Sequence, residues 1–186
     1  MPELSAQTVR QVYEAAGSTA PAPGGGAVTS LAGMLGIALI LKALRISLRK
    51  RDDAADYAPV DAALDGLAQA LERDADADSA AFEGFIRASK FPRATDEEKA
   101  VRAAALERAA MEAAEAALAT LEHAVEAIAQ ARRLRGVIAA NITGDILAGV
   151  QLLEAARTVA IDNAEANLAA VKAEAAREPS PNAWRR

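Results

Sequence analysis

Alanine makes up roughly a quarter of this chain, and this feature restricts the fold more than any other. Alanine has the highest helix propensity, and its small side chain lets neighbouring helices approach closely. No stretch of four or more residues alternates cleanly with the period of two that a half-buried strand shows. The sequence therefore predicts an all-α fold, a long and mostly antiparallel bundle of about five helices. Small side chains bury little area within one subunit, so we also expect a second copy to complete some helix faces.

Caps and breaks divide the chain into five expected helices. Ser5 is a suitable N-cap for the first helix, and Thr95 with Glu98 has the pattern of a capping box for the fourth. The expected helices cover residues 5–16, 25–51, 60–89, 95–134 and 137–176. Together they form one helical domain over residues 1–178, followed by a frayed tail over residues 179–186.

Charge, cysteine content and hydropathy exclude several classes of function. The net charge of −5 and the pI near 5.0 argue against a nucleic-acid partner, whose phosphates need a basic surface. The absence of cysteine excludes disulfides and thiolate chemistry. The longest apolar run, residues 27–41, is shorter than the about 20 residues that a membrane span requires. We expect a buried central helix there, no membrane association, and a cytoplasmic protein, because residues 1–9 lack a signal-sequence pattern.

The most distinctive segment is the loop Pro21-Ala-Pro-Gly-Gly-Gly26, which leads into the second expected helix. Glycines at this place let backbone N–H groups approach an anion at the positive end of the helix dipole. A tight loop-to-helix junction would need the same residues, and spacing alone favours that structural interpretation. Gly33 and Gly36 continue a small-residue face and indicate helix packing.

Two polar pairs stand in the last expected helix. Asn141 and Asp145 are four residues apart, so they share a face that is otherwise apolar. A carboxylate there is costly to bury alone, so we expect Asp145 to be salt-bridged, helix-capping or catalytic. Asn163 and Asn167 form the second pair, about 27 Å further along the helix. Either one pair is structural, or a second, antiparallel chain brings Asp145 near the asparagines; we favour the second arrangement.

Acidic and basic groups provide further candidates. Asp74 and Asp78 share a helix face, which is either a solvated acidic surface or part of a site. Lys90, and the pair Arg49 and Lys50, could supply cations for a carboxylated ligand. His123 is the only histidine, and such a residue is usually at the surface or in packing. A lone histidine cannot form a usual metal site, and the acids show no metal-binding grouping, so we expect no metal.

Several of these segments together resemble one family. The loop ending at Gly26, with Ala32, Gly33 and Gly36 behind it, resembles the family's N-terminal signature. Asp76 to Asp78, Phe82, the Lys90-Phe-Pro92 turn and Thr95 to Lys99 resemble its middle segment, and residues 141–145 with Asn163 and Asn167 resemble its last helix. The family is that of formiminotetrahydrofolate cyclodeaminases and methenyltetrahydrofolate cyclohydrolases, and the resemblance covers nearly the whole chain.

The resemblance implies an all-α homodimer that binds a tetrahydrofolate-type molecule where the subunits meet. The implied reaction is hydrolysis of 5,10-methenyltetrahydrofolate to 10-formyltetrahydrofolate, without a metal or another cofactor. Formiminotetrahydrofolate cyclodeamination with release of ammonia, or folate binding without catalysis, are the alternatives. Asp145 is the implied catalytic carboxylate, which would stabilise the cationic bridge and accept a proton from water. The implied substrate-binding residues are Pro23, Gly24, Gly25, Gly26, Arg49, Lys50, Asp78, Lys90, Asn141, Asn163 and Asn167.

Four positions depart from the family's pattern. Leu48 stands where a glycine before two lysines is usual, and Arg45 stands where an uncharged polar residue is common. Gly144 replaces the serine that usually precedes Asp145, and Ala117 replaces a frequent helix-kinking proline. We expect these changes to leave the fold intact and to bear on the identity of the substrate.

Overall fold

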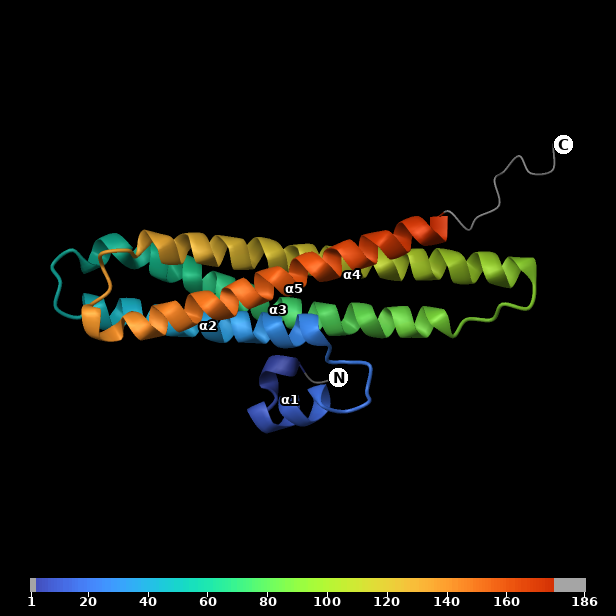
Figure 1. Ribbon diagram of the computed structural model, residues 1–186, viewed down its shortest axis with the longest axis horizontal. Helices are drawn as coiled ribbons and strands as arrows, with labels where there is room; N and C mark the ends of the chain where they lie inside the picture. The colour runs from blue at the N-terminus through green and yellow to red at the C-terminus, as the bar shows by residue number, and fades with distance from the viewer. Residues whose placement is uncertain (1–2, 176–186) are drawn as a thin grey trace.

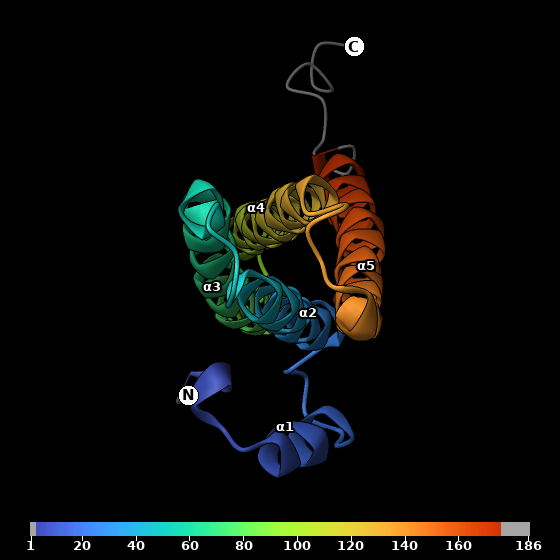
Figure 2. The ribbon, with the colours of Figure 1, turned by 90° about the vertical axis from the view of Figure 1, so that its left-hand side faces the viewer.

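The computed structural model describes residues 3–175, and this part of the chain is an all-α bundle. Four long helices lie side by side along its long axis (Figure 1). They are α2 (Gly25–Leu48), α3 (Ala58–Ser89), α4 (Asp96–Arg133) and α5 (Thr143–Ala175). Each packs against the next, and α5 packs against α2, so the four helices surround one core (Figure 2). The predicted fold class is confirmed.

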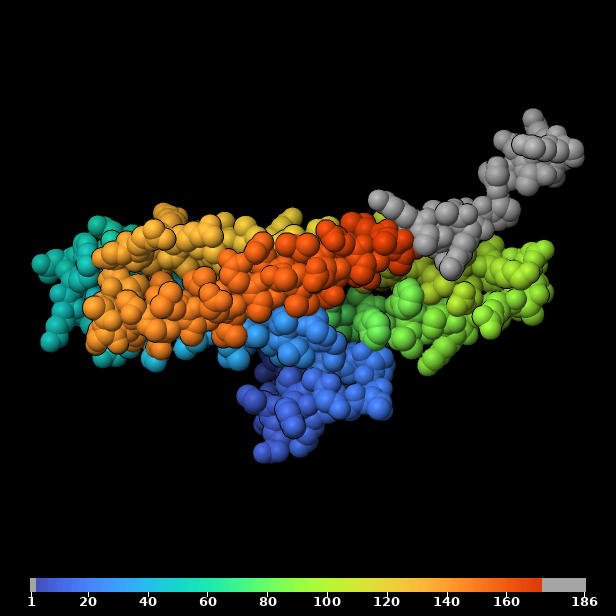
Figure 3. All heavy atoms as spheres, viewed as in Figure 1, coloured from blue at the N-terminus to red at the C-terminus, as the bar shows by residue number. Residues whose placement is uncertain are grey.

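The N-terminal segment lies outside this bundle. It consists of a 3-10 turn, η1 (Leu4–Ala6), and the short helix α1 (Val9–Ala16), and it projects from one side of the molecule (Figure 3). The predicted N-cap Ser5 is wrong, because Ser5 lies within η1. Thr8 caps α1 instead: its hydroxyl accepts from the Gln11 N–H, and the Gln11 side chain accepts from the Thr8 N–H. Of Ser5 and Thr8, only Thr8 has a glutamine or glutamate three residues later, so only Thr8 can complete a capping box at the start of α1.

The next three helices lie close to their predicted bounds. Helix α2 begins at Gly25 as expected and ends at Leu48, three residues early. Helix α3 begins two residues early at Ala58, after the 3-10 turn η2 (Ala54–Tyr57), and places its proline in the first turn, where the missing N–H costs nothing. The predicted capping box at the start of α4 is confirmed, since Thr95 and Glu98 exchange both hydrogen bonds.

The last helix begins later than predicted. Gly136 adopts φ +88°, and a loop with the 3-10 turn η3 (Ala140–Ile142) carries the chain from α4 to α5. The Ala139 N–H donates to Ser47 Oγ over 2.9 Å, which fixes this loop against the end of α2. Asn141 therefore lies in η3, and the prediction that it shares a face of the last helix with Asp145 is wrong. The predicted tail, residues 179–186, lies outside the described residues.

Small residues let α2 and α5 cross with their backbones in contact. A Cβ added to Gly36 would lie 2.6 Å from the Gly149 carbonyl oxygen, and a Cβ on Gly33 would lie 3.3 Å from Ala156 Cβ. Both glycines are packing residues, as predicted.

Helix α2 is long and apolar enough to span a membrane by composition alone, yet 56% of its most apolar window is buried in the bundle. That burial fits the predicted central helix.

Candidate functional site

The first turn of α2, one carboxylate of α3 and one asparagine of α5 meet in the middle of the bundle. The Ala27 N–H donates to Asp78 Oδ2 over 2.9 Å. A Cβ added to Gly26 would collide with Asp78 Oδ1 and would lie 2.8 Å from Asn163 Nδ2. Glycine is thus required at position 26 by the close approach of two polar side chains. We call Gly26, Asp78 and Asn163 the glycine-turn cluster.

The carboxyl of Asp78 is half-buried, and this environment shifts its pKa. Its burial raises the pKa above the ordinary value, while the hydrogen bond from the Ala27 N–H acts in the opposite direction. No cation pairs with this carboxyl among the ion pairs of the described residues. A carboxyl whose pKa lies nearer to neutrality can both accept and donate a proton during a reaction.

Other predicted binding residues lie close to this cluster. Gly24 is the N-cap of α2, Gly25 is its first residue, and Asn167 follows Asn163 by one turn of α5. Pro23 lines a cavity of about 480 Å³ between the N-terminal segment and α3. Asp76 lines the same cavity and accepts from the Leu4 N–H over 2.7 Å, so it anchors η1.

A second group of polar side chains lies buried beside the cluster. The Ser30 hydroxyl donates to the Gly26 carbonyl over 3.0 Å and lies 3.2 Å from the Thr120 hydroxyl. Asp74 is buried and lies 2.7 Å from His123 Nδ1. Burial raises the pKa of Asp74, and the contact with His123 counteracts that rise. Asp74 is therefore no part of a solvated acidic surface, the alternative left open for this run of acids.

The sequence does not indicate this pairing. His123 was expected at the surface or in packing, and its side chain is indeed 33% exposed, but its contact with Asp74 joins residues 49 positions apart. Ser30 stands beside Thr29 in the first turns of α2, and Thr120 is the only hydroxyl residue of α4. Nothing in the sequence pairs them, because such residues often satisfy their own helix carbonyls.

Asp145 lies far from the glycine-turn cluster in the chain's fold. Its Oδ2 is 2.6 Å from Lys42 Nζ, and its side chain is 30% exposed. Lys42 is 16 residues beyond Gly26 on α2, which corresponds to about 24 Å along the helix. Of the three expected roles, the salt bridge is the one observed. Within a single chain Asp145 does not reach the glycine-turn cluster, and the same end of the bundle carries Asn141, Arg49 and Lys50, all exposed.

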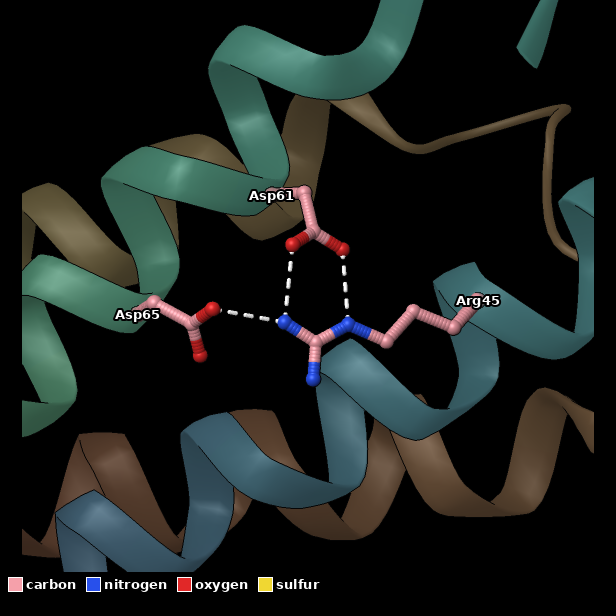
Figure 4. Close-up of polar contacts among 3 residues, drawn as sticks. All are labelled: Arg45, Asp61 and Asp65. Carbon is pink, nitrogen blue, oxygen red and sulfur yellow. Dashed lines mark hydrogen bonds and ion pairs between the residues drawn. The ribbon is translucent and has the colours of Figure 1, made fainter. Parts of the chain in front are cut away.

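Arg45 shows why one departure from the family pattern is compatible with the fold. Its guanidinium donates to both carboxylate oxygens of Asp61, over 2.7 and 2.8 Å, and to Asp65 over 2.6 Å (Figure 4). The guanidinium lowers the pKa of Asp61. This pairing joins the end of α2 to the start of α3, so Arg45 is engaged within the protein. Lys90, the C-cap of α3, is exposed and lies about 18 Å along α3 from Asp78.

A sequence model of the formiminotransferase-cyclodeaminase family matches residues 8–183 of this chain. The chain belongs to this family. It is also 32% identical over 106 residues to a methenyltetrahydrofolate cyclohydrolase from Methylorubrum extorquens, a match over 55% of this chain. The chain spans about half the length, 51%, of that relative.

A solved structure supports the fold of this family member. The formiminotetrahydrofolate cyclodeaminase from Thermotoga maritima superimposes with a TM-score of 0.74 at 22% sequence identity. The alignment covers 94% of this chain and 91% of that one. The family inferred from the glycine loop, the middle segment and the last helix is therefore confirmed.

Proposed function

We propose that this protein is a methenyltetrahydrofolate cyclohydrolase and that its reaction takes place at the glycine-turn cluster. Family membership and the similarity to a cyclohydrolase support a folate one-carbon enzyme. The observation that carries the proposal is Asp78, a half-buried carboxyl with a raised pKa held against a glycine turn. Asn163 beside it supplies an amide that can orient the folate.

The chemistry needs one group that moves a proton twice. Water attacks the cationic carbon that bridges N5 and N10, and Asp78 accepts one of its protons. The same proton passes from Asp78 to N5 as the bond between N5 and the carbon breaks. The remaining hydroxyl proton leaves to solvent as the formyl group forms on N10. The negative charge of Asp78 also stabilises the cationic bridge before attack.

A second copy of the chain can complete this site. Along α2, Val28, Leu35 and Lys42 are spaced by seven residues and so share one face, and Leu35 at its centre is 53% exposed. No charged residue interrupts α2 before Lys42. If two copies pack antiparallel about Leu35, Lys42 of each copy lies beside Val28 of the other, within one turn of Gly26.

This antiparallel dimer gives the predicted residues of the opposite end a role. Because Asp145 is paired with Lys42, both side chains would lie at the glycine-turn cluster of the other copy. Arg49 follows Lys42 by seven residues, and Lys50 is next to it. From a second copy these cations would face the loop before Gly26, where the glutamate tail of a folate would find them. The antiparallel dimer gives no such role to Lys90 and Asn141.

The direct test follows the loss of the near-ultraviolet absorbance of 5,10-methenyltetrahydrofolate. We expect decay faster than in buffer, and a rate at least about 100-fold lower for Asp78→Asn, the usual cost of losing a general acid–base group. Asp96→Asn, at the exposed start of α4, is the matched control and should retain the full rate.

Other outcomes would redirect the proposal. Ammonia release from a formimino substrate without methenyl hydrolysis would identify a cyclodeaminase. Tight folate binding without turnover would identify a binding protein. Full activity of Asp78→Asn, together with a loss in Asp145→Asn that leaves the dimer intact, would assign the proton transfer to Asp145.

A further inference from the structure

A row of polar contacts crosses the core from the glycine-turn cluster to the surface of α4. It starts at the Gly26 carbonyl, which accepts from Ser30 Oγ over 3.0 Å. Ser30 Oγ is 3.2 Å from Thr120 Oγ1, a contact between α2 and α4 across the bundle. Thr120 lies one turn from His123 on α4, and His123 Nδ1 is 2.7 Å from Asp74 on α3. Ser30, Thr120 and Asp74 are all buried.

Apolar side chains could stabilise the bundle at these positions as well as a polar row does. Buried polar groups are costly when unpaired, but replacing both partners by apolar groups of the same shape is often nearly neutral or even stabilising. Alanine at position 30 and valine at position 120 would replace the two side chains with apolar groups of similar size. The bond from Ser30 to Gly26 is the usual bond of a helical serine to its own helix. The contact between Ser30 and Thr120 is different, because it crosses from α2 to α4 and so connects α4 with the glycine-turn cluster.

The two hydroxyl hydrogens of the row have four possible acceptors, namely the Gly26 carbonyl, the two hydroxyl oxygens and the Asp74 carboxylate. If the Thr120 hydroxyl donates to Ser30, the Ser30 hydrogen is free for the Gly26 carbonyl. If it donates to the Asp74 carboxylate, Ser30 can turn its hydrogen to Thr120, and the Gly26 carbonyl then loses the Ser30 bond and keeps the bond from Thr29 Oγ1 at 3.1 Å. Hydrogen bonding from Thr120 is one of the effects that lower the pKa of Asp74. The charge on Asp74 and His123 thus determines how the row is oriented.

We infer that the Asp74–His123 pair is a positioning element of the glycine-turn cluster, which acts through Thr120 and Ser30 on the Gly26 carbonyl. The pair fixes the first turn of α2, and with it the Ala27 N–H that holds Asp78. Other charges near His123 are Glu122 and Glu126 on its own helix and Arg73 on α3. None of these belongs to the row. The effect on turnover rests on the proposed function, whereas the coupling itself does not.

His123 is the only histidine, so NMR can follow its imidazole alone during a pH titration. We expect the amide resonances of Gly26 and Ala27 to titrate with the same midpoint as His123 in the unaltered protein. Thr120→Val keeps the side-chain shape and removes the hydroxyl, so this coupling should disappear. Thr158→Val is the matched control, because the Thr158 hydroxyl is exposed and donates only to the carbonyl of Glu154 in its own helix.

Turnover provides the second readout. We expect Thr120→Val and His123→Leu to lower kcat about tenfold with KM within twofold, and to change the pH profile of kcat. His123→Asn, which keeps a donor near Nδ1, should restore most of the rate. The inference would be overturned if the amide resonances of Gly26 and Ala27 did not follow the titration of His123. Coupling that persists unchanged in the Thr120→Val variant would overturn it as well. Intact coupling in a protein that hydrolyses no folate would overturn the proposed function alone.

Discussion

At the scale of single residues, Gly26 is the position that tolerates change least. A Cβ there would overlap Asp78 Oδ1 and approach Asn163 Nδ2, both parts of the candidate site. We expect Gly26→Ala to displace these side chains and to reduce turnover at least as much as the loss of Asp78. The matched control is Gly66→Ala in α3, where no atom lies within 4 Å of the added Cβ. That control should be stabilised by up to about 1 kcal/mol, the helix-propensity difference, with turnover unchanged. Equal activity of the two variants would contradict the crowding argument.

The raised pKa of Asp78 gives a second residue-scale prediction. Burial places this pKa in the folded protein above its value in the unfolded chain, so the folded state binds the proton more tightly. The free energy of unfolding then falls as pH rises from the ordinary carboxyl pKa, about 4, through the folded value. Asp78→Asn carries no charge and still offers an oxygen to the Ala27 N–H. It should melt at a higher temperature than the unaltered protein at pH 7, and this difference should vanish near pH 4. A pH-independent difference would show that desolvation of Asp78 is not its cause.

At the scale of elements, the hydrophobic periodicity, the helix caps and the glycine and proline breaks predicted the helices well. The capping box at Thr95 fixed one helix start, and the glycine loop fixed another. The errors, at Ser5 and at the start of α5, fall where short 3-10 turns replace helix. Such turns depend on how a loop packs, as the bond from Ala139 to Ser47 illustrates, and local sequence does not encode that contact.

The site was predictable only in part, for a related reason. Gly26, Asp78 and Asn163 were all singled out from the sequence, and the structure brings them together. The partners of Asp74 and Asp145 were not predictable. Each partner lies on another helix, and which side chains meet depends on the rotation and register of the packed helices. Sequence spacing defines the face of one helix, but not the residue opposite it.

The crossing of α2 and α5 supplies an element-scale prediction. A Cβ on Gly36 would lie 2.6 Å from the Gly149 carbonyl oxygen and 3.0 Å from Leu152 Cβ, so the helices would have to move apart. We expect Gly36→Ala to destabilise the bundle by about 1–3 kcal/mol, the usual cost of overpacking a core. Chemical denaturation measures the free energy of unfolding of each variant. Gly66→Ala is the control, and its free energy of unfolding should rise instead of falling. A stabilised Gly36→Ala variant would mean that the two helices are not held at this distance.

At the scale of the whole molecule, exposed apolar side chains provide a test of the proposed dimer. Leu35 is 53% exposed on α2, with Val28 seven residues before it and Lys42 seven residues after it, and no charged residue lies between Val28 and Lys42. Met111 on α4 is similarly exposed, at 48%, but glutamates follow it in the sequence at positions 112 and 115. The two residues therefore offer a matched comparison between a proposed interface and an ordinary surface position.

We expect Leu35→Glu to convert a dimer of the 19.2 kDa chain into monomers, because two-fold packing would bring two carboxylates together in an apolar interface. Methenyltetrahydrofolate hydrolysis should fall with it, since Asp145 and Lys42 of the second copy would leave the glycine-turn cluster. Met111→Glu should remain dimeric and active. Light scattering at micromolar concentration measures the first effect, and the absorbance assay measures the second. A monomeric unaltered protein would refute the dimer, while an active monomeric Leu35→Glu variant would show that one chain holds the complete site.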